Sequence, residues 1–160
     1  MDSTVQEWMT SRLNGYVMAM AHIDGIPGDA IANAHIFDLD ENDLLESLRR
    51  HLEQAPGDQY VYGEMTEIHD PWSRQVVIAL DAFFFRHPFA GLTEHESRQV
   101  KATREGMVTR IEDLIGMITD HYSCRKIYRV EMRSNSGHAG HMHIFPLSHR
   151  FLVFKTISRL

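Results

Sequence analysis

Four histidines lie close together near the end of the sequence. They are His138, His141, His143 and His149, in the segment GHAGHMHIFPLSH. Side chains two residues apart point to the same side of an extended strand, so His141 and His143 are predicted to present both imidazoles on one face. Imidazole is a common ligand of zinc, iron and nickel. The spacing therefore indicates a metal site formed by His138, His141 and His143, with Glu131 or His149 as alternatives to His138.

A second interpretation gives these histidines no chemical role. The pattern H-x-H is short and often arises by chance. The sequence also contains no H-E-x-x-H, no P-loop and no G-x-S-x-G. We therefore favour a solvated hairpin over a metal site, and we expect no resident cofactor. A metal analysis after chelator treatment distinguishes the two interpretations.

Length and composition indicate one globular domain. The chain has 160 residues, which is the size of a single domain covering residues 1–160. Hydrophobic residues make up 43% and charged residues 24%, and these values exclude a disordered or low-complexity chain. The net charge is −6, although basic residues are concentrated after position 125. Because a nucleic-acid partner requires a basic face, the overall sign argues against one.

Cysteine use and hydropathy indicate where the protein works. Cys124 is the only cysteine, which excludes an internal disulfide and is typical of a reducing compartment. The longest apolar stretches cover residues 76–80 and 82–85, far short of the roughly 20 residues of a membrane span. Residues 1–6 lack the features of a secretory signal. We therefore expect a cytoplasmic protein without a membrane segment.

Four segments have the apolar spacing of helices. They cover residues 3–23, 40–55, 70–87 and 93–121. Ser3 with Gln6, and Thr93 with Glu96, match the capping box that begins many helices. The last helix is predicted to be the longest, with an apolar seam from Val100 to Ile118.

The pattern changes to short strands after residue 125. Residues 127–132, 142–147 and 151–157 are rich in β-formers and are separated by turn residues. Residues 34–39 and 59–65 are candidates for two further strands. Pro146 cannot donate a ladder hydrogen bond, so its strand is predicted to lie at an edge or to carry a bulge. The sequence therefore predicts an α+β fold with about four helices followed by a small, mostly antiparallel C-terminal sheet.

The absence of a catalytic motif favours a non-enzymatic function. We expect a binding or assembly protein that acts through protein–protein contacts, as small immunity or inhibitor proteins and other accessory proteins of mobile elements do. The apolar helices over residues 70–87 and 93–121 predict a homodimer through one of them. The alternative is a small metal-dependent enzyme that uses the C-terminal histidines.

Overall fold

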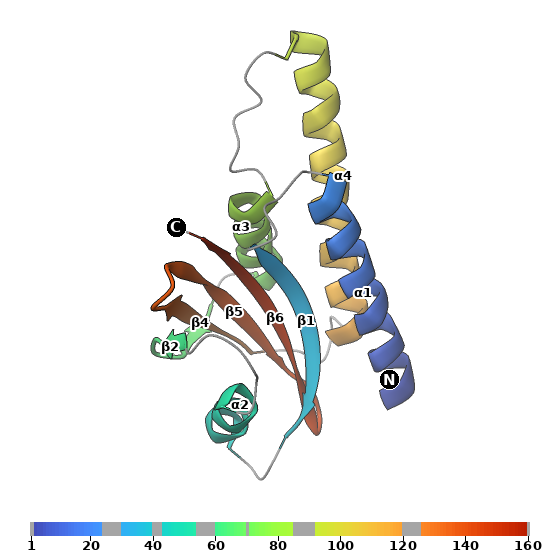
Figure 1. Ribbon diagram of the computed structural model, residues 1–160. Helices are drawn as coiled ribbons and strands as arrows, with labels where there is room; N and C mark the ends of the chain where they lie inside the picture. Colours follow the sequence, from blue (N-terminus) through green and yellow to red (C-terminus); the bar gives the residue numbers. More distant parts are fainter. Residues whose placement is uncertain are drawn as a thin grey trace.

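The computed structural model describes residues 2–23, 30–39, 43–53, 60–69, 71–84, 92–119 and 126–159. These ranges form four helices and six strands (Figure 1). The helices are α1 (Ser3–Ile23), α2 (Leu44–Glu53), α3 (Trp72–Phe84) and α4 (Glu94–Thr119). The strands are β1 (Ile31–Asp38), β2 (Tyr60–Tyr62), β3 (Thr66–Ile68), β4 (Ile127–Ser134), β5 (His138–Pro146) and β6 (Arg150–Arg159).

All six strands join one antiparallel sheet. Its order is β1-β6-β5-β4-β2, and β3 pairs with β4 beside β2. The α+β class with an antiparallel C-terminal sheet is therefore confirmed. The three C-terminal strands form the middle of the sheet, while β1 is added at one edge and β2 with β3 at the other.

Local hydrogen bonds explain where two helices begin. Thr93 and Glu96 form the predicted capping box of α4, since the Thr93 N–H donates to Glu96 Oε2 over 2.8 Å and the Glu96 N–H donates to Thr93 Oγ1 over 3.3 Å. At α1 the cap is Asp2 rather than Ser3. Asp2 Oδ1 accepts from the Thr4 N–H over 3.0 Å, and the Asp2 carbonyl accepts from Gln6.

Residues 59–65 were expected to form one strand, but this part of the chain contributes two. Tyr62 pairs with Met132, and Thr66 pairs with Arg129. The chain advances four residues from Tyr62 to Thr66 but only three from Arg129 to Met132, so the segment between β2 and β3 has one extra residue. The extra residue is accommodated after Gly63, whose N–H donates to the Glu131 carbonyl over 2.9 Å. A bulge of this kind separates β2 from β3.

Pro146 was predicted to lie in an edge strand or at a bulge, and the edge position is wrong because β5 lies between β4 and β6. Pro146 is the last residue of β5, and the pairing with β4 has already ended at Ile144. The missing N–H therefore interrupts no hydrogen bond to β4.

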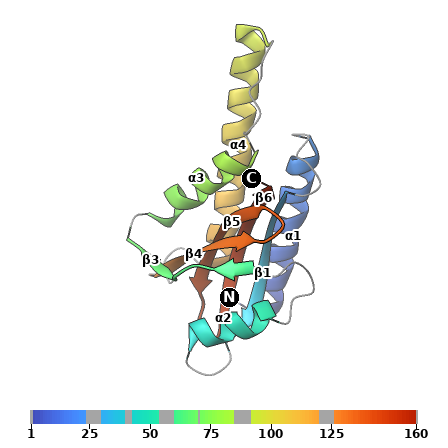
Figure 2. The same cartoon turned by 60° about the vertical axis from the view of Figure 1, so that its left-hand side comes forward.

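Helices cover both faces of the sheet. α1 and α4 lie side by side on one face, whereas α2 lies on the other (Figures 1 and 2). The first face carries the larger apolar core, in which Leu13, Ile111 and Phe154 are fully buried. The second face carries a smaller core around Leu48 of α2 and Phe151 of β6. Within the described ranges, no helix is both long enough and apolar enough to cross a membrane.

Candidate functional site

The structure brings together two of the three predicted metal ligands. His141 and His143 lie on the same face of β5. α3 packs over the part of this face that carries the two histidines. His143 is 1% exposed and His141 is half-buried. His138 is three residues before His141 and therefore belongs to the opposite face. There its Nδ1 hydrogen-bonds Ser136 Oγ over 2.8 Å.

The two histidines line a cavity of about 300 Å³ between α3 and the sheet, which we call the histidine cavity. It is lined by Gln75, Ile78 and Ala79 of α3, Arg129, Glu131, Met132 and Arg133 of β4, Ala139, Gly140, His141 and His143 of β5, and Thr156 and Ser158 of β6. Its volume is at the lower end of the range for small-molecule sites.

The cavity exists because this face of the sheet changes from apolar to polar along its strands. On β5, buried Phe145 gives way to His143 and then to His141. On β6, buried Phe154 gives way to Thr156 in the same register, since His143 pairs with Phe154 and His141 with Thr156. The apolar part of this sheet face packs in the core beneath α1 and α4, and the polar part of the same face lies beneath α3.

Gly140 allows β5 and β6 to approach closely at the cavity. A Cβ atom at this position would overlap the Thr156 carbonyl oxygen and would lie 2.8 Å from Ile157 Cα. Only glycine fits here without moving a strand. Gly140 therefore fixes the spacing of the two strands that carry His141 and Thr156.

Both histidines are held neutral at pH 7. The pKa of His143 is lowered to about 4, mainly by burial and in addition by the nearby His141 and Arg129. The pKa of His141 is also lowered, first by burial and then by Arg129, while Glu131 partly opposes this shift. A neutral imidazole has one N–H donor and one acceptor nitrogen.

Several polar groups of the cavity lack partners among the residues that the structure describes. Nδ1 of His141 and Nδ1 of His143 are buried without a hydrogen bond. In the part of the chain that the structure describes, Arg129, Glu131 and Arg133 form neither a side-chain hydrogen bond nor an ion pair. Unpaired buried polar groups are uncommon and costly, and they often mark a ligand site.

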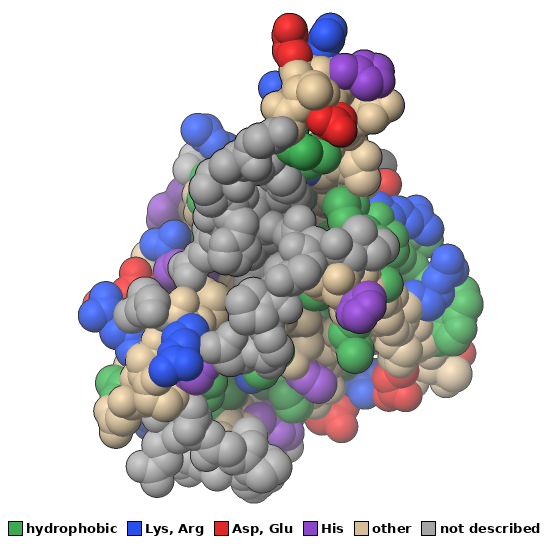
Figure 3. All heavy atoms as spheres, turned by 45° about the horizontal axis from the view of Figure 1, so that its top comes forward, with side chains coloured by type: hydrophobic (Ala, Val, Ile, Leu, Met, Phe, Trp, Pro, Cys, Tyr) green, Lys and Arg blue, Asp and Glu red, His purple; other side chains and the backbone are tan. Residues whose placement is uncertain are grey.

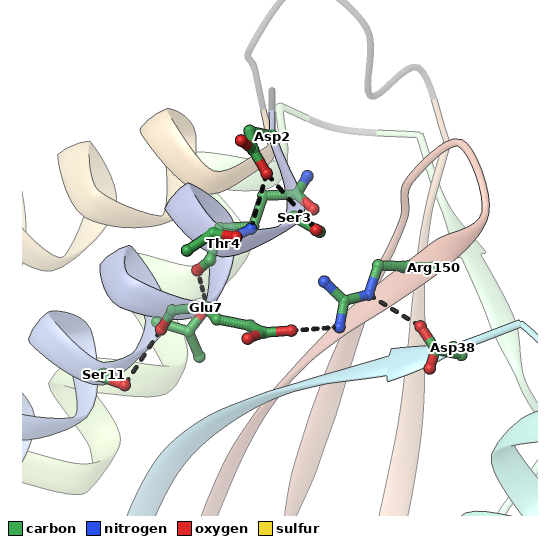
Figure 4. Close-up of polar contacts among 9 residues, drawn as sticks. Asp2, Ser3, Thr4, Glu7, Ser11, Asp38 and Arg150 are labelled. Atoms are coloured by element: carbon green, nitrogen blue, oxygen red, sulfur yellow. Dashed lines mark hydrogen bonds and ion pairs between the residues drawn. The ribbon is translucent and has the colours of Figure 1, made fainter.

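Arg150 provides a contrast at the other end of the sheet (Figure 4). Its Nη2 donates to Glu7 of α1 over 2.8 Å, and its Nε donates to Asp38 of β1 over 3.0 Å. The same three residues and His149, the alternative ligand, line a separate cavity of about 480 Å³. We assign Arg150 a structural role because its charge is matched by two carboxylates of the fold, although its Nη1 is buried without a hydrogen-bond partner.

A complete metal site is not assembled among the residues described. No group of three His, Cys, Asp or Glu side chains lies close enough there to hold an ion. His138, His141 and His143 therefore remain predicted ligands, of which only the last two share a face. Cys124 lies outside the described residues.

Arg129, Gln75 and Thr156 were missed by sequence reasoning. Arg129 alternates with Glu131 and Arg133 on β4, which is a visible signal that their side chains share a face. The sequence gives no register between β4 and β5, however, and so does not place Arg129 opposite His143.

A second candidate surface is the N-terminal half of α4, residues 94–107. It contains no buried residue, and the first buried side chain of the helix is Val108. This half projects beyond the sheet in Figure 2, and charged side chains of both signs gather on the projecting end at the top of Figure 3. The seam from Ile111 to Ile118, by contrast, is used inside the core.

Comparisons with protein-family models, with curated proteins and with solved structures found no match to this chain.

Proposed function

We propose that this chain is a non-enzymatic assembly protein that acts through protein–protein contacts and forms a homodimer through residues 94–107 of α4. The observation that carries the proposal is the exposure of half of a 26-residue helix. A helix of about 14 residues in water is only marginally stable without packing. The capping box and the exposed Glu94–Arg98 ion pair at 3.7 Å supply local support, but no apolar burial.

A second copy of the chain suits this surface. Val100 and Met107 are partly exposed and continue the spacing of the buried Ile111, so they offer an apolar line for a partner helix. The first turn is acidic, whereas Arg98 and Lys101 follow it. In an antiparallel pair related by twofold symmetry, Val100 of one copy would lie opposite Met107 of the other.

Only the N-terminal part of the predicted apolar seam from Val100 to Ile118 is available to a partner. Ile111, Leu114 and Ile118 are buried against the sheet and α1, so they cannot also serve a partner. The proposed interface is therefore restricted to the N-terminal half of α4. We place the protein in the cytoplasm as part of the same proposal, because its single cysteine suits a reducing compartment.

Light scattering at micromolar concentration tests the dimer. We expect twice the chain mass of 18.5 kDa, and we expect the double variant Val100→Glu and Met107→Glu to give the mass of one chain. The matched control is Ala102→Glu with Thr109→Glu, two exposed positions on the opposite side of α4, and it is expected to remain dimeric. A parent protein that is monomeric throughout the concentration range would contradict the proposal.

A small metal-dependent enzyme remains the second candidate, favoured by one observation. His141 and His143 share a face at a cavity, and neither Nδ1 atom has a hydrogen-bond partner. Untagged protein purified without added metal and dialysed against a chelator would keep a stoichiometric ion if this candidate is correct.

A further inference from the structure

We infer that the histidine cavity binds a small molecule that carries an oxyanion, either a phosphate or a carboxylate. This inference is independent of the proposed dimer, because no residue of α4 lines the cavity. It rests on the charge of the lining, on the hydrogen-bonding groups left without partners, and on the shape of the site.

The charged groups of the lining favour an anion. Arg129 and Arg133 point to the same face of β4, and Glu131 between them is the one acidic side chain among the described residues of the lining. Apart from the histidines, the described lining therefore carries two positive charges and one negative charge. Guanidinium groups bind carboxylate and phosphate oxygens with paired hydrogen bonds, and neither arginine is engaged by the described residues.

The buried wall of the cavity supplies neutral donors. His143 is almost completely buried, and Thr156 beside it is 5% exposed. An imidazole N–H and a hydroxyl can both donate to an oxygen atom of a ligand, while Gln75 on α3 brings an amide to the opposite wall. Cationic and neutral donors that converge on a sheltered site are typical of oxyanion recognition.

The position of Glu131 narrows the class of ligand. Glu131 lies directly across from His141 and is exposed, so it belongs to the mouth of the cavity rather than to its buried wall. A carboxylate there accepts a hydrogen bond from a hydroxyl or an amine. The cavity of about 300 Å³ also has room for more than a phosphate ion. We therefore expect a small hydroxylated or amine-bearing phosphate or carboxylate.

The contrast with Arg150 argues against a purely structural role for the cavity arginines. The guanidinium of Arg150 binds two carboxylates that belong to α1 and β1 (Figure 4). Arg129 has the acidic Glu131 two residues away on the same strand, and yet no ion pair joins them in the described structure. The donors of Arg129 are thus available to a ligand.

Calorimetric titration of the full chain tests the inference, with glycerol 3-phosphate and malate as probes. We expect saturable binding of one of them, and the probe that binds identifies phosphate or carboxylate as the recognised group. The variant Arg129→Gln is expected to weaken this binding about tenfold or more, because it removes a hydrogen bond to a charged group. Arg110→Gln, at an exposed position of α4 outside the cavity, carries the same charge change and is expected to bind like the parent.

Several results would overturn the inference. One is the absence of saturable binding of both probes to a parent protein that melts cooperatively. Another is an Arg129→Gln variant that binds as tightly as the parent. A third is zinc binding that depends on His141 and His143 while neither probe binds, since that result assigns the cavity to a cation. Melting curves of both variants establish that a lost signal reflects the site and not unfolding.

Discussion

The buried side chain of His143 makes the free energy of unfolding depend on pH. Burial among sheet and helix residues lowers its pKa from 6.5 to about 4. In the unfolded chain the imidazole regains its ordinary pKa, so the unfolded state binds more protons between pH 6.5 and pH 4. The contribution of His143 to the free energy of unfolding is therefore greatest above pH 6.5. This contribution falls as the pH is lowered from 6.5 to 4, and it is lost completely below pH 4.

We expect this contribution to reach about 3 kcal/mol, since each pKa unit corresponds to about 1.4 kcal/mol. Urea unfolding of the parent at a series of pH values between 7.5 and 4 measures it. The lowered pKa values of His141 and His35 act in the same direction. The variant His143→Asn should show a flatter pH dependence, whereas His22→Asn, at an exposed position of α1, should follow the parent. Equal slopes in all three proteins would disprove the role of His143.

At the scale of elements, Arg150 joins three segments that are far apart in the sequence. It begins β6 and contacts Glu7 of α1 and Asp38 of β1. Its side chain is 18% exposed, but the two carboxylates are 61% and 79% exposed, so solvent screens both pairs. The contacts therefore orient α1 against the sheet more than they add to the total stability.

The substitution Arg150→Gln is expected to lower the free energy of unfolding by about 1–2 kcal/mol. The loss should shrink at high salt, because salt screens charges at partly exposed sites. Arg49→Gln is the matched control, since Arg49 forms an exposed pair with Glu46 at 3.6 Å and should change stability by less than about 0.5 kcal/mol. Chemical denaturation at low and high salt measures both effects. A loss that is identical at both salt concentrations would contradict an electrostatic origin.

The elements that the sequence predicted well are those with local signals. The capping box of Thr93 and Glu96 predicted the start of α4, because its hydrogen bonds join residues three apart. The leucines at helical spacing predicted α2, in which Leu48 is buried. Arg129 and His143 meet only through the register of two strands, and Asp2 rather than Ser3 caps α1 because two donors reach its oxygens. The strand register depends on tertiary geometry, which residue spacing does not encode, whereas the cap at Asp2 is local and lies one residue before the predicted cap.

Within the candidate site, the sequence predicted that His141 and His143 share a face but did not predict which residues surround them. The spacing of His141 and His143 placed them on one face, as the strand geometry requires. It also placed His138 on the other face, although the metal hypothesis included that residue. The wall formed by α3 had no signal in the sequence, since a helix can pack on either face of a sheet.

At the scale of the whole molecule, the sign of the net charge depends on the protonation of the histidines. The net charge is −6 with neutral histidines and would be +5 with all eleven protonated. Three histidines have lowered pKa values and take up a proton at a lower pH than an ordinary histidine, so the net charge passes through zero at a lower pH than the histidine count indicates. Repulsion between molecules is weakest where the net charge is small.

We expect solubility to be poorest just below the sequence pI of about 6.0, because the lowered histidine pKa values shift the point of zero charge downward, and to recover by pH 8. The measurement is the protein concentration left in solution after equilibration at each pH. Added salt should raise the solubility at this minimum, because salt screens the attraction between opposite charges on neighbouring molecules. A flat profile between pH 6 and pH 8 would show that charge does not limit association.

The place of β6 in the sheet has a consequence for how the molecule is made. β1 pairs with β6, from Ile31 opposite Ile157 to Asp38 opposite Arg150. At roughly 5–20 residues per second, a ribosome needs on the order of ten seconds to travel from the first partner to the second. Throughout that interval β1 lacks its neighbour, so the alternating Ala32, Ala34 and Ile36 cannot yet pack in the finished sheet. The sheet closes only when β6, the last of its strands in the sequence, has been made.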